Sequence, residues 1–158
     1  MTPKPLNEIK EFCLQLFDLI GANQNVARAC VNSVMHGTRF GVDSHGVRLV
    51  PHYIKVLETG RLNKNPSIQF KSSKPSSGLL DGDHSQGALP TYTAMDYAIE
   101  MAKKTGIAAV GVTNSSHFGP AGAYTLYAAK KNMIALAFCN SDSFVRLYDG
   151  AERFHGTN

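Results

Sequence analysis

The 158-residue chain contains no tryptophan and only three cysteines. Its uninterrupted apolar runs all fall well short of the ~18 residues that a membrane-spanning helix needs. Cys13, Cys30 and Cys139 are widely separated and odd in number, which argues against a disulfide framework and for a reducing compartment. The first residues include an acidic Glu8 and no apolar core, unlike a secretory signal. We therefore expect a cytoplasmic protein that does not associate with membranes.

Several motifs that would specify a chemistry are also missing. Neither an H-E-x-x-H nor a C-x-x-C spacing occurs, and the six histidines are scattered, so we expect no metal site. No G-x-G-x-x-G follows an expected strand, which excludes the Rossmann fingerprint for dinucleotides. A nucleophile elbow of the form G-x-S-x-G is absent as well. A hydrolase that uses Ser116 or Ser141 with His117 is therefore a minor alternative.

The charge distribution excludes one class of partner. The net charge is +4 with histidine neutral, and no basic stripe or aromatic platform accompanies it, so we expect no nucleic-acid partner. A modestly basic site for an anionic substrate or a phosphate-bearing cofactor fits this charge better. With 43% hydrophobic and 18% charged residues, the chain suits a globular protein that has its own core.

The first sixty residues have the apolar spacing of amphipathic helices. Apolar residues recur every three to four positions, which predicts helices over 6–20, 24–38 and 44–59. Ser44 is placed to cap the third helix, which puts Ser44 and His45 at its N-terminal end. Pro51 kinks that helix unless the helix begins there.

The sequence after residue 63 has a different character. Turn-forming residues at Lys64-Asn65-Pro66 indicate a boundary between a helical region, 1–63, and an α/β region, 64–158. The second region is expected to form a hairpin over 67–82, a helix over 87–104, a strand over 107–113, a helix over 120–131 and a strand over 133–139. The last three elements make a strand–helix–strand unit, which favours a layered α/β (α+β) fold.

Two short turns place a histidine beside a serine and a glycine. One is Asp43-Ser44-His45-Gly46, and the other is Ser115-Ser116-His117-Phe118-Gly119, which follows the expected strand 107–113. Histidine has an ordinary pKa of ~6.5 and exchanges a proton near neutral pH. A rigid strand that ends in a polar turn is a common way to present such a group. His117 is therefore the first candidate for catalysis, although a histidine that satisfies only the backbone of its turn fits the same pattern.

Three further residues are candidates for binding. Arg48 follows His45 by one helical turn and can clamp a carboxylate, or it can be a solvated surface residue. Ser141 and Asp142 follow the expected strand 133–139, where polar groups can hold a ligand or form an Asx turn. Asp142 is also placed to orient an imidazole.

Four ordered motifs together resemble one family. They are Gly41-Val42-Asp43-Ser44-His45-Gly46-Val47 with Tyr53, Ser116-His117-Phe118-Gly119 with Ala121-Gly122 and Tyr124, Asn140-Ser141-Asp142, and Gly156-Thr157-Asn158. The pattern closely resembles the malate/L-lactate dehydrogenase family of NAD(P)-dependent 2-hydroxy-acid and 2-oxo-acid oxidoreductases. That family includes ureidoglycolate dehydrogenase and is distinct from the Rossmann dehydrogenases. Its members are much longer, so the resemblance implies that this chain is an N-terminal half.

The resemblance implies a fold and a chemistry. The fold is a helical N-terminal region followed by a mixed, non-Rossmann NAD(P)-binding sheet with flanking helices, incomplete without the C-terminal half. The chemistry is hydride transfer between NAD or NADP and a small 2-hydroxy or 2-oxo acid of the malate, lactate or ureidoglycolate class. Homodimers are usual in the family. We expect the 158-residue chain alone to be inactive, because an incomplete pocket cannot position hydride donor and acceptor.

The resemblance also implies roles for particular residues. The general acid/base is His117, which also lies at the cofactor. Asp142 matches the ureidoglycolate dehydrogenase version of its motif, and its position after the expected strand makes it the catalytic candidate that orients the imidazole. Ser44 and His45 line the substrate pocket, and Ser141 contacts the nicotinamide cofactor.

Two positions depart from the family pattern. Arg48 is assigned to the substrate, although the family's arginine usually stands where this chain has Leu49. Asp149 stands where relatives commonly have glycine. Both departures support an alternative, in which the protein is a half-length binding or regulatory relative without catalysis.

Overall fold

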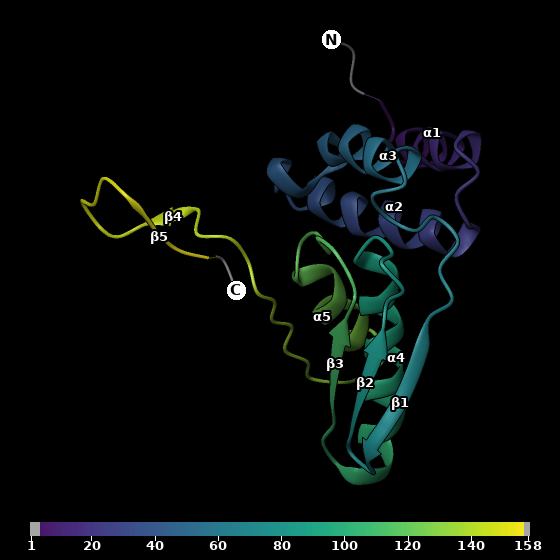
Figure 1. Cartoon of the computed structure of the whole chain (residues 1–158), viewed down its shortest axis with the longest axis vertical. Coiled ribbons are helices and arrows are strands. Elements are labelled where there is room, and N and C mark those ends of the chain that lie inside the picture. The colour runs from purple at the N-terminus through teal and green to yellow at the C-terminus, as the bar shows by residue number, and fades with distance from the viewer. Residues whose placement is uncertain (1–3, 157–158) are drawn as a thin grey trace.

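The computed structural model describes residues 4–156 of the chain. Figure 1 shows three helices packed together beyond one end of a small sheet, with two further helices beside that sheet. The helical region comes first and the sheet is mixed, so the predicted α/β class is confirmed. The division of the chain at residue 63 stays a prediction.

The N-terminal helices lie close to where the apolar spacing predicts them. They are α1 (Leu6–Leu19), α2 (Gln24–Arg39) and α3 (Val50–Glu58). Gly21 has a φ of +66°, a conformation that glycine adopts readily, and it lies in the turn after α1. The Asn23 side chain then caps α2, since its Oδ1 accepts a hydrogen bond from the Asn25 N–H at 2.7 Å.

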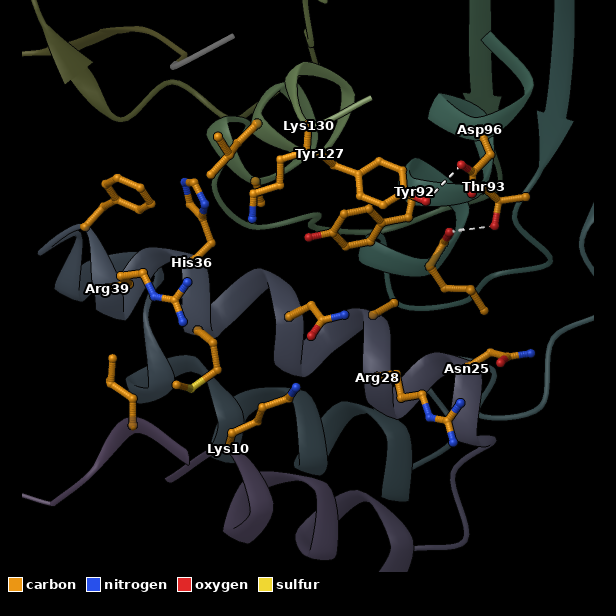
Figure 2. A pocket seen from close by; sticks show the side chains of 18 of the residues that line it. Lys10, Asn25, Arg28, His36, Arg39, Tyr92, Thr93, Asp96, Tyr127 and Lys130 are labelled. Atoms are coloured by element: carbon orange, nitrogen blue, oxygen red, sulfur yellow. Dashed lines mark hydrogen bonds between the residues drawn. The ribbon is translucent and has the colours of Figure 1, made fainter. Parts of the chain in front are cut away.

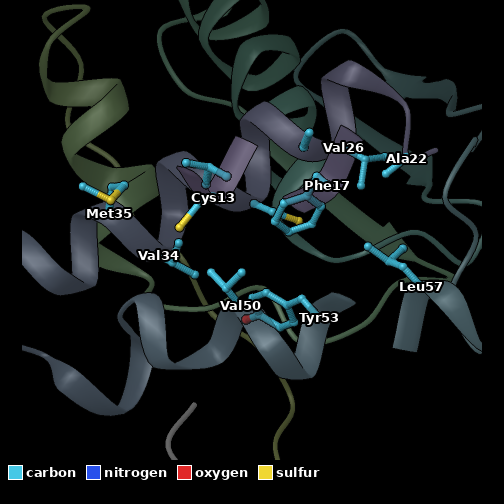
Figure 3. Close-up of a cluster of buried hydrophobic side chains, with 12 residues drawn as sticks. Cys13, Phe17, Ala22, Val26, Val34, Met35, Val50, Tyr53 and Leu57 are labelled. Atoms are coloured by element: carbon cyan, nitrogen blue, oxygen red, sulfur yellow. The ribbon is translucent and has the colours of Figure 1, made fainter. Parts of the chain in front are cut away.

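A cluster of buried apolar side chains holds the three helices together (Figure 3). Phe17 of α1, Val34 of α2 and Leu57 of α3 are at most 1% exposed. Burial of such side chains stabilises a fold by ~1.5–3 kcal/mol each. Tyr53 belongs to the same cluster and is 2% exposed, so a polar hydroxyl is held at the edge of an otherwise apolar core.

The third helix begins later than the sequence predicts. Asp43–His45 and Val47–Leu49 form two short 3₁₀ turns, and α3 starts one residue before Pro51. The expectation that Ser44 caps this helix is therefore wrong. Gly46 is extended between the two turns, and Pro51 in the first turn of α3 needs no intrahelical N–H partner, which favours the start of the helix there.

The sheet contains both kinds of strand pairing. Its strands are β1 (Gln69–Lys74), β2 (Ser77–Asp81) and β3 (Ala109–Thr113), in that order. The first two form the predicted antiparallel hairpin, while β3 runs parallel to β2. The connection between β2 and β3 is α4 (Ala88–Thr105), which packs on the sheet, with Tyr97 stacked on Phe70 at a ring separation of 3.9 Å.

The predicted strand at 133–139 is absent from the structure. After α5 (Gly122–Ala129) the chain is extended, but no ladder is assigned to residues 133–139, and Ile134, Leu136 and Phe138 are exposed. The alternation typical of a strand is present, yet a strand also needs a neighbouring backbone to accept and donate its hydrogen bonds.

The chain then leaves the body of the molecule and ends in a two-stranded ribbon (Figure 1). The ribbon pairs β4 (Val145–Arg146) with β5 (Arg153–His155) in antiparallel register. Across residues 4–156, no helix has both the length and the apolar character required to cross a bilayer.

Candidate active site

The turn that carries His117 follows β3 directly and presses against α2. Gly119 has a φ of +82°, and a Cβ placed there would lie 2.5 Å from Ser33 Oγ of α2. Glycine is therefore required at this position both for its conformation and for the close approach.

Side chains from three separate parts of the fold hold this turn in place. Gln86 Nε2 donates to the His117 carbonyl oxygen at 2.9 Å, and Ser33 Oγ donates to the Phe118 carbonyl oxygen at 3.1 Å. The Tyr124 hydroxyl of α5 donates to the same Phe118 oxygen. Buried polar groups that find partners in this way fix a loop in one conformation.

Gln86 is itself fully buried, and both its amide nitrogen and its amide oxygen form hydrogen bonds. Its Oε1 accepts hydrogen bonds from Cys30 Sγ at 3.0 Å and from the Ala88 N–H at 2.7 Å. A Cβ added to the neighbouring Gly87 would lie 2.1 Å from the Ser116 oxygen, so the His117 turn lies directly on the start of α4.

The imidazole of His117 has one engaged nitrogen. The Tyr53 hydroxyl is 2.8 Å from Nδ1, and the His45 ring lies at a centroid separation of 5.4 Å. In the part of the chain that the structure describes, Nε2 has no hydrogen-bond partner, and the side chain is exposed. The nitrogen left available for a further hydrogen bond is therefore Nε2.

The surroundings favour the neutral form of His117. Partial loss of hydration lowers the pKa of His117 below its ordinary value, and the nearby His45 and His52 lower it further. Burial raises the pKa of Tyr53, so its hydroxyl stays protonated at physiological pH. Both members of the pair are therefore neutral, and the tautomer of His117 decides which of them donates the hydrogen bond.

The turn that carries His45 is built from fewer contacts. The Ser44 hydroxyl is 2.9 Å from His45 Nδ1, and both residues lie in the first 3₁₀ turn. Thr38 Oγ1 accepts from the Val47 N–H at 3.0 Å. The turn also packs on Gly37, where an added Cβ would lie 2.3 Å from the His45 oxygen.

The structure brings some predicted residues together and leaves others apart. His117, His45 and Ser44 form one cluster, and Arg48 lies nearby along the chain, exposed in the second 3₁₀ turn. The expected placement of Arg48 on the same helix face as His45 is wrong, because the two residues lie in different 3₁₀ turns.

Ser141 and Asp142 lie on the extended segment after α5, and both are exposed. Ser141 Oγ donates to the Asp142 carbonyl oxygen at 3.4 Å. The partner of His117 Nδ1 is Tyr53 rather than Asp142, so an orienting role for Asp142 stays a prediction. Thr157 and Asn158 of the last motif lie outside the described residues.

Four supporting residues were missed by reasoning from the sequence. In the sequence, Tyr53 and Tyr124 are recognisable only as members of the family motifs, and Ser33 and Gln86 belong to no motif. The signal that points to the last two is a polar residue in an apolar stretch, and both are at most 1% exposed.

No three or more histidine, cysteine, aspartate or glutamate side chains within residues 4–156 are grouped so as to hold a metal ion. The chemistry offered by the site is therefore that of imidazole, phenol and hydroxyl groups. These groups exchange protons and donate hydrogen bonds.

Fold and site together define a class: an α/β protein that presents a proton-exchanging imidazole at the end of a parallel strand. Residues 5–158 match the family model described as malate/L-lactate dehydrogenase, and the chain belongs to this family. It is similar to the malate dehydrogenase of Pyrococcus abyssi, with 37% identity over 98% of this chain and 42% of that protein.

Two further comparisons agree. The ureidoglycolate dehydrogenase (NAD(+)) of Escherichia coli O157:H7 is 28% identical over 87% of this chain and 40% of that protein. The solved structure of malate dehydrogenase from Pyrococcus horikoshii OT3 matches with a TM-score of 0.80 and 32% identity, over 84% of this chain and 38% of that one. The chain thus spans about two fifths of the length of these relatives.

Proposed function

We propose that the protein is an oxidoreductase that transfers a hydride between NAD or NADP and a small 2-hydroxy or 2-oxo acid. Support comes from the family and from relatives named as dehydrogenases of malate and ureidoglycolate, the second with NAD(+) in its name. The observation that carries the proposal is the exposed His117 side chain, whose Nδ1 is engaged by buried Tyr53 while Nε2 has no hydrogen-bond partner among the described residues.

The donor set fits the proton half of such a reaction. Protein side chains do not carry hydride, so a nicotinamide cofactor supplies the hydride acceptor or donor when it is bound. His117 Nε2 takes the proton from the substrate hydroxyl during oxidation and returns it to the carbonyl oxygen during reduction. A base at Nε2 requires the hydrogen on Nδ1, so the Tyr53 oxygen accepts from Nδ1–H in that form.

The remaining predicted residues take binding roles in this proposal. His45 faces the same open side as His117, and Ser44 holds the Nδ1 of His45, so these two side chains contact the substrate. Arg48 supplies the cation for the substrate carboxylate. Ser141 contacts the cofactor and Asp142 assists His117 once the segment after α5 is folded against the site.

We also propose that the active form is a cytoplasmic homodimer and that the 158 residues alone do not turn over. His117 is exposed and His45 is only half-buried, and an open site leaves the hydride donor and acceptor free to move and exposed to water. Turnover by the 158-residue chain alone would contradict this part of the proposal.

The test measures NADH and NADPH oxidation by the complete product of the gene against malate-, lactate- and ureidoglycolate-class 2-oxo acids. His117→Gln should lower kcat by ~10²–10⁴-fold, the usual contribution of a general acid/base. His155→Gln, which changes a histidine of the terminal ribbon, is the matched control and should leave kcat unchanged. Binding of NADH without turnover by the unmodified protein would instead establish the half-length binding or regulatory relative.

A further inference from the structure

A groove bordered by α2 has a lining that the proposed reaction does not use. It has a volume of about 600 Å³ and lies between α1 and α2 on one side and α4 and α5 on the other (Figure 2). That volume falls within the range of small-molecule sites, ~300–1,000 Å³.

Five basic side chains from three helical segments line this groove. They are Lys10, Arg28, His36, Arg39 and Lys130. Those of α2 recur at 28, 36 and 39, a spacing that puts them on one face of a helix. Figure 2 shows His36, Arg39 and Lys130 gathered at one end, with Arg28 at the other.

These cations are not neutralised within the described residues. Asp96 is the one carboxylate in the lining, and it already accepts hydrogen bonds from Lys131 Nζ and from the Tyr127 hydroxyl at 2.8 Å. Arg28 is bonded to the neutral Gln24 side chain at 3.2 Å. Lys10, Arg39 and Lys130 form no ion pair in residues 4–156.

The electrostatic state of His36 agrees with an excess of positive charge. Loss of hydration lowers the pKa of His36, and the charges of Arg39 and Lys130 lower it further. The position of Arg39 in the last turn of α2 offsets the helix dipole, but that role does not apply to Lys10 or Arg28.

The rest of the lining adds donors and flat apolar surface. The amides of Asn7, Asn25 and Asn32 supply N–H groups, and Tyr92 and Tyr127 supply aromatic faces beside them. Such a set matches an anion with several oxygen acceptors, because guanidinium and ammonium groups bind phosphate oxygens through charge-assisted hydrogen bonds.

We propose that this groove binds the phosphate groups of a small molecule. The proposal does not depend on hydride transfer at His117. Two sources share this chemistry: a free oligophosphate and the phosphates of a nicotinamide dinucleotide. An acidic polypeptide is a different class of partner, and the gathering of His36, Arg39 and Lys130 at one end of the groove favours the small ligand.

The experiment titrates the purified protein with inorganic pyrophosphate by calorimetry, and follows the Cε1–H resonance of His36 by NMR. Saturable binding is expected, together with a rise in the pKa of His36 because the bound anion offsets its cationic neighbours. Arg39→Gln and Lys130→Gln should each weaken binding by ~10-fold, the scale of one charge-assisted hydrogen bond. Lys55→Gln, an exposed lysine of α3 outside the groove, should bind like the unmodified protein.

A second titration with NADP and NAD identifies the source. Displacement of pyrophosphate by either dinucleotide assigns the groove to cofactor phosphates, and independence assigns it to a free oligophosphate. Three results would overturn the proposal: no saturable binding of pyrophosphate, unchanged affinity in both groove variants, or tighter binding of a hexaglutamate peptide than of pyrophosphate. None of these readouts requires dehydrogenase activity, so failure here is separate from failure of the proposed reaction.

Discussion

The two histidine turns of the candidate site face one another but are held to very different degrees. The His117 turn is fixed through its carbonyl oxygens by Gln86, Ser33 and Tyr124, and through its ring by Tyr53. The ring of His45 has one partner, the hydroxyl of its own neighbour Ser44, which is exposed.

The difference fits the two tasks proposed for these rings. Proton transfer needs a donor–acceptor geometry accurate to a few tenths of an ångström, and a ring locked by buried partners provides it. Recognition of a substrate tolerates a ring that adjusts its rotamer. We infer that the fold assigns its rigidity to His117 and leaves His45 free to adapt, and four predictions test this contrast.

The largest effect is expected where the His117 turn meets α4. Gly87→Ala puts a Cβ within 2.1 Å of the Ser116 oxygen, and two backbone segments must separate to admit it. The free energy of unfolding should fall by ~2–3 kcal/mol, the range for a forced core displacement. Gly37→Ala, under the His45 turn, should cost less, since alanine recovers ~1 kcal/mol of helix propensity inside α2.

Urea denaturation of the two variants measures this difference. Gly111→Ala in β3 is the control, because the Cβ there meets the flexible end of the Leu79 side chain at 3.2 Å rather than backbone. Equal stabilities of the Gly87 variant and the unmodified protein would show that the two backbones are not in contact.

The elements that the sequence predicts correctly are those whose signal is local. The apolar spacing of α1, α2 and α4 and the turn residues between β1 and β2 act within a few positions of one another. The same holds for β3, which is short, apolar and followed by the His117 turn.

The features that the sequence does not predict depend on contacts between residues far apart in the chain. Residues 133–139 have the alternation of a strand, but no strand forms in the described chain because pairing depends on another backbone. Tyr53 and His117 are 64 positions apart, so no local sequence pattern predicts their contact. The predicted start of α3 is wrong because Gly46 is extended and Pro51 favours a helix start, and these two residues outweigh the apolar spacing of the segment.

The second prediction concerns a variant that lacks the hydrogen-bond partner of the His117 ring. Tyr53→Phe keeps the packing of the core but deletes the hydroxyl that engages His117 Nδ1. We expect kcat of the complete gene product to fall ~10-fold, the equivalent of one hydrogen bond of ~1.4 kcal/mol, with KM little changed. His45→Gln should do the opposite, raising KM more than it lowers kcat.

NMR of ¹⁵N-labelled histidine separates positioning from a loss of stability. In the unmodified protein His117 should favour a single tautomer, and in Tyr53→Phe the two tautomers should become mixed. An unchanged tautomer ratio in the variant would show that Tyr53 does not set the state of the ring.

The third prediction concerns pH. The pKa of His117 is lowered, so its base form persists below the ordinary pKa of ~6.5. The rate of hydroxy-acid oxidation should therefore stay constant as the pH drops to ~6.5. It should fall only as the pH passes through the lowered pKa of His117. His45→Gln should shift this limb to higher pH, because the positive charge of a protonated His45 is one of the causes that lower the pKa of His117.

The stability of the fold should depend on the same group, with the sign opposite to that of a histidine in an ion pair, because the pKa of His117 is lowered by folding. The unfolded chain binds a proton to this histidine more readily than the folded chain, so the free energy of unfolding falls as pH drops from ~6.5 toward the lowered pKa. His117→Gln should flatten this part of the stability curve. A curve with the same slope in the variant would assign the pH dependence to other groups.

The smallest effect is expected from a change next to the His45 ring. Ser44→Ala removes the hydroxyl that is 2.9 Å from His45 Nδ1, but Ser44 is exposed and His45 is only half-buried, so water replaces the lost partner. The free energy of unfolding should change by less than ~0.5 kcal/mol, the usual limit for a surface substitution. Its effect on KM should be smaller than that of His45→Gln. If Ser44→Ala instead lowers kcat as much as Tyr53→Phe does, then both histidine rings are held rigidly. The inferred difference between the two turns would then be wrong.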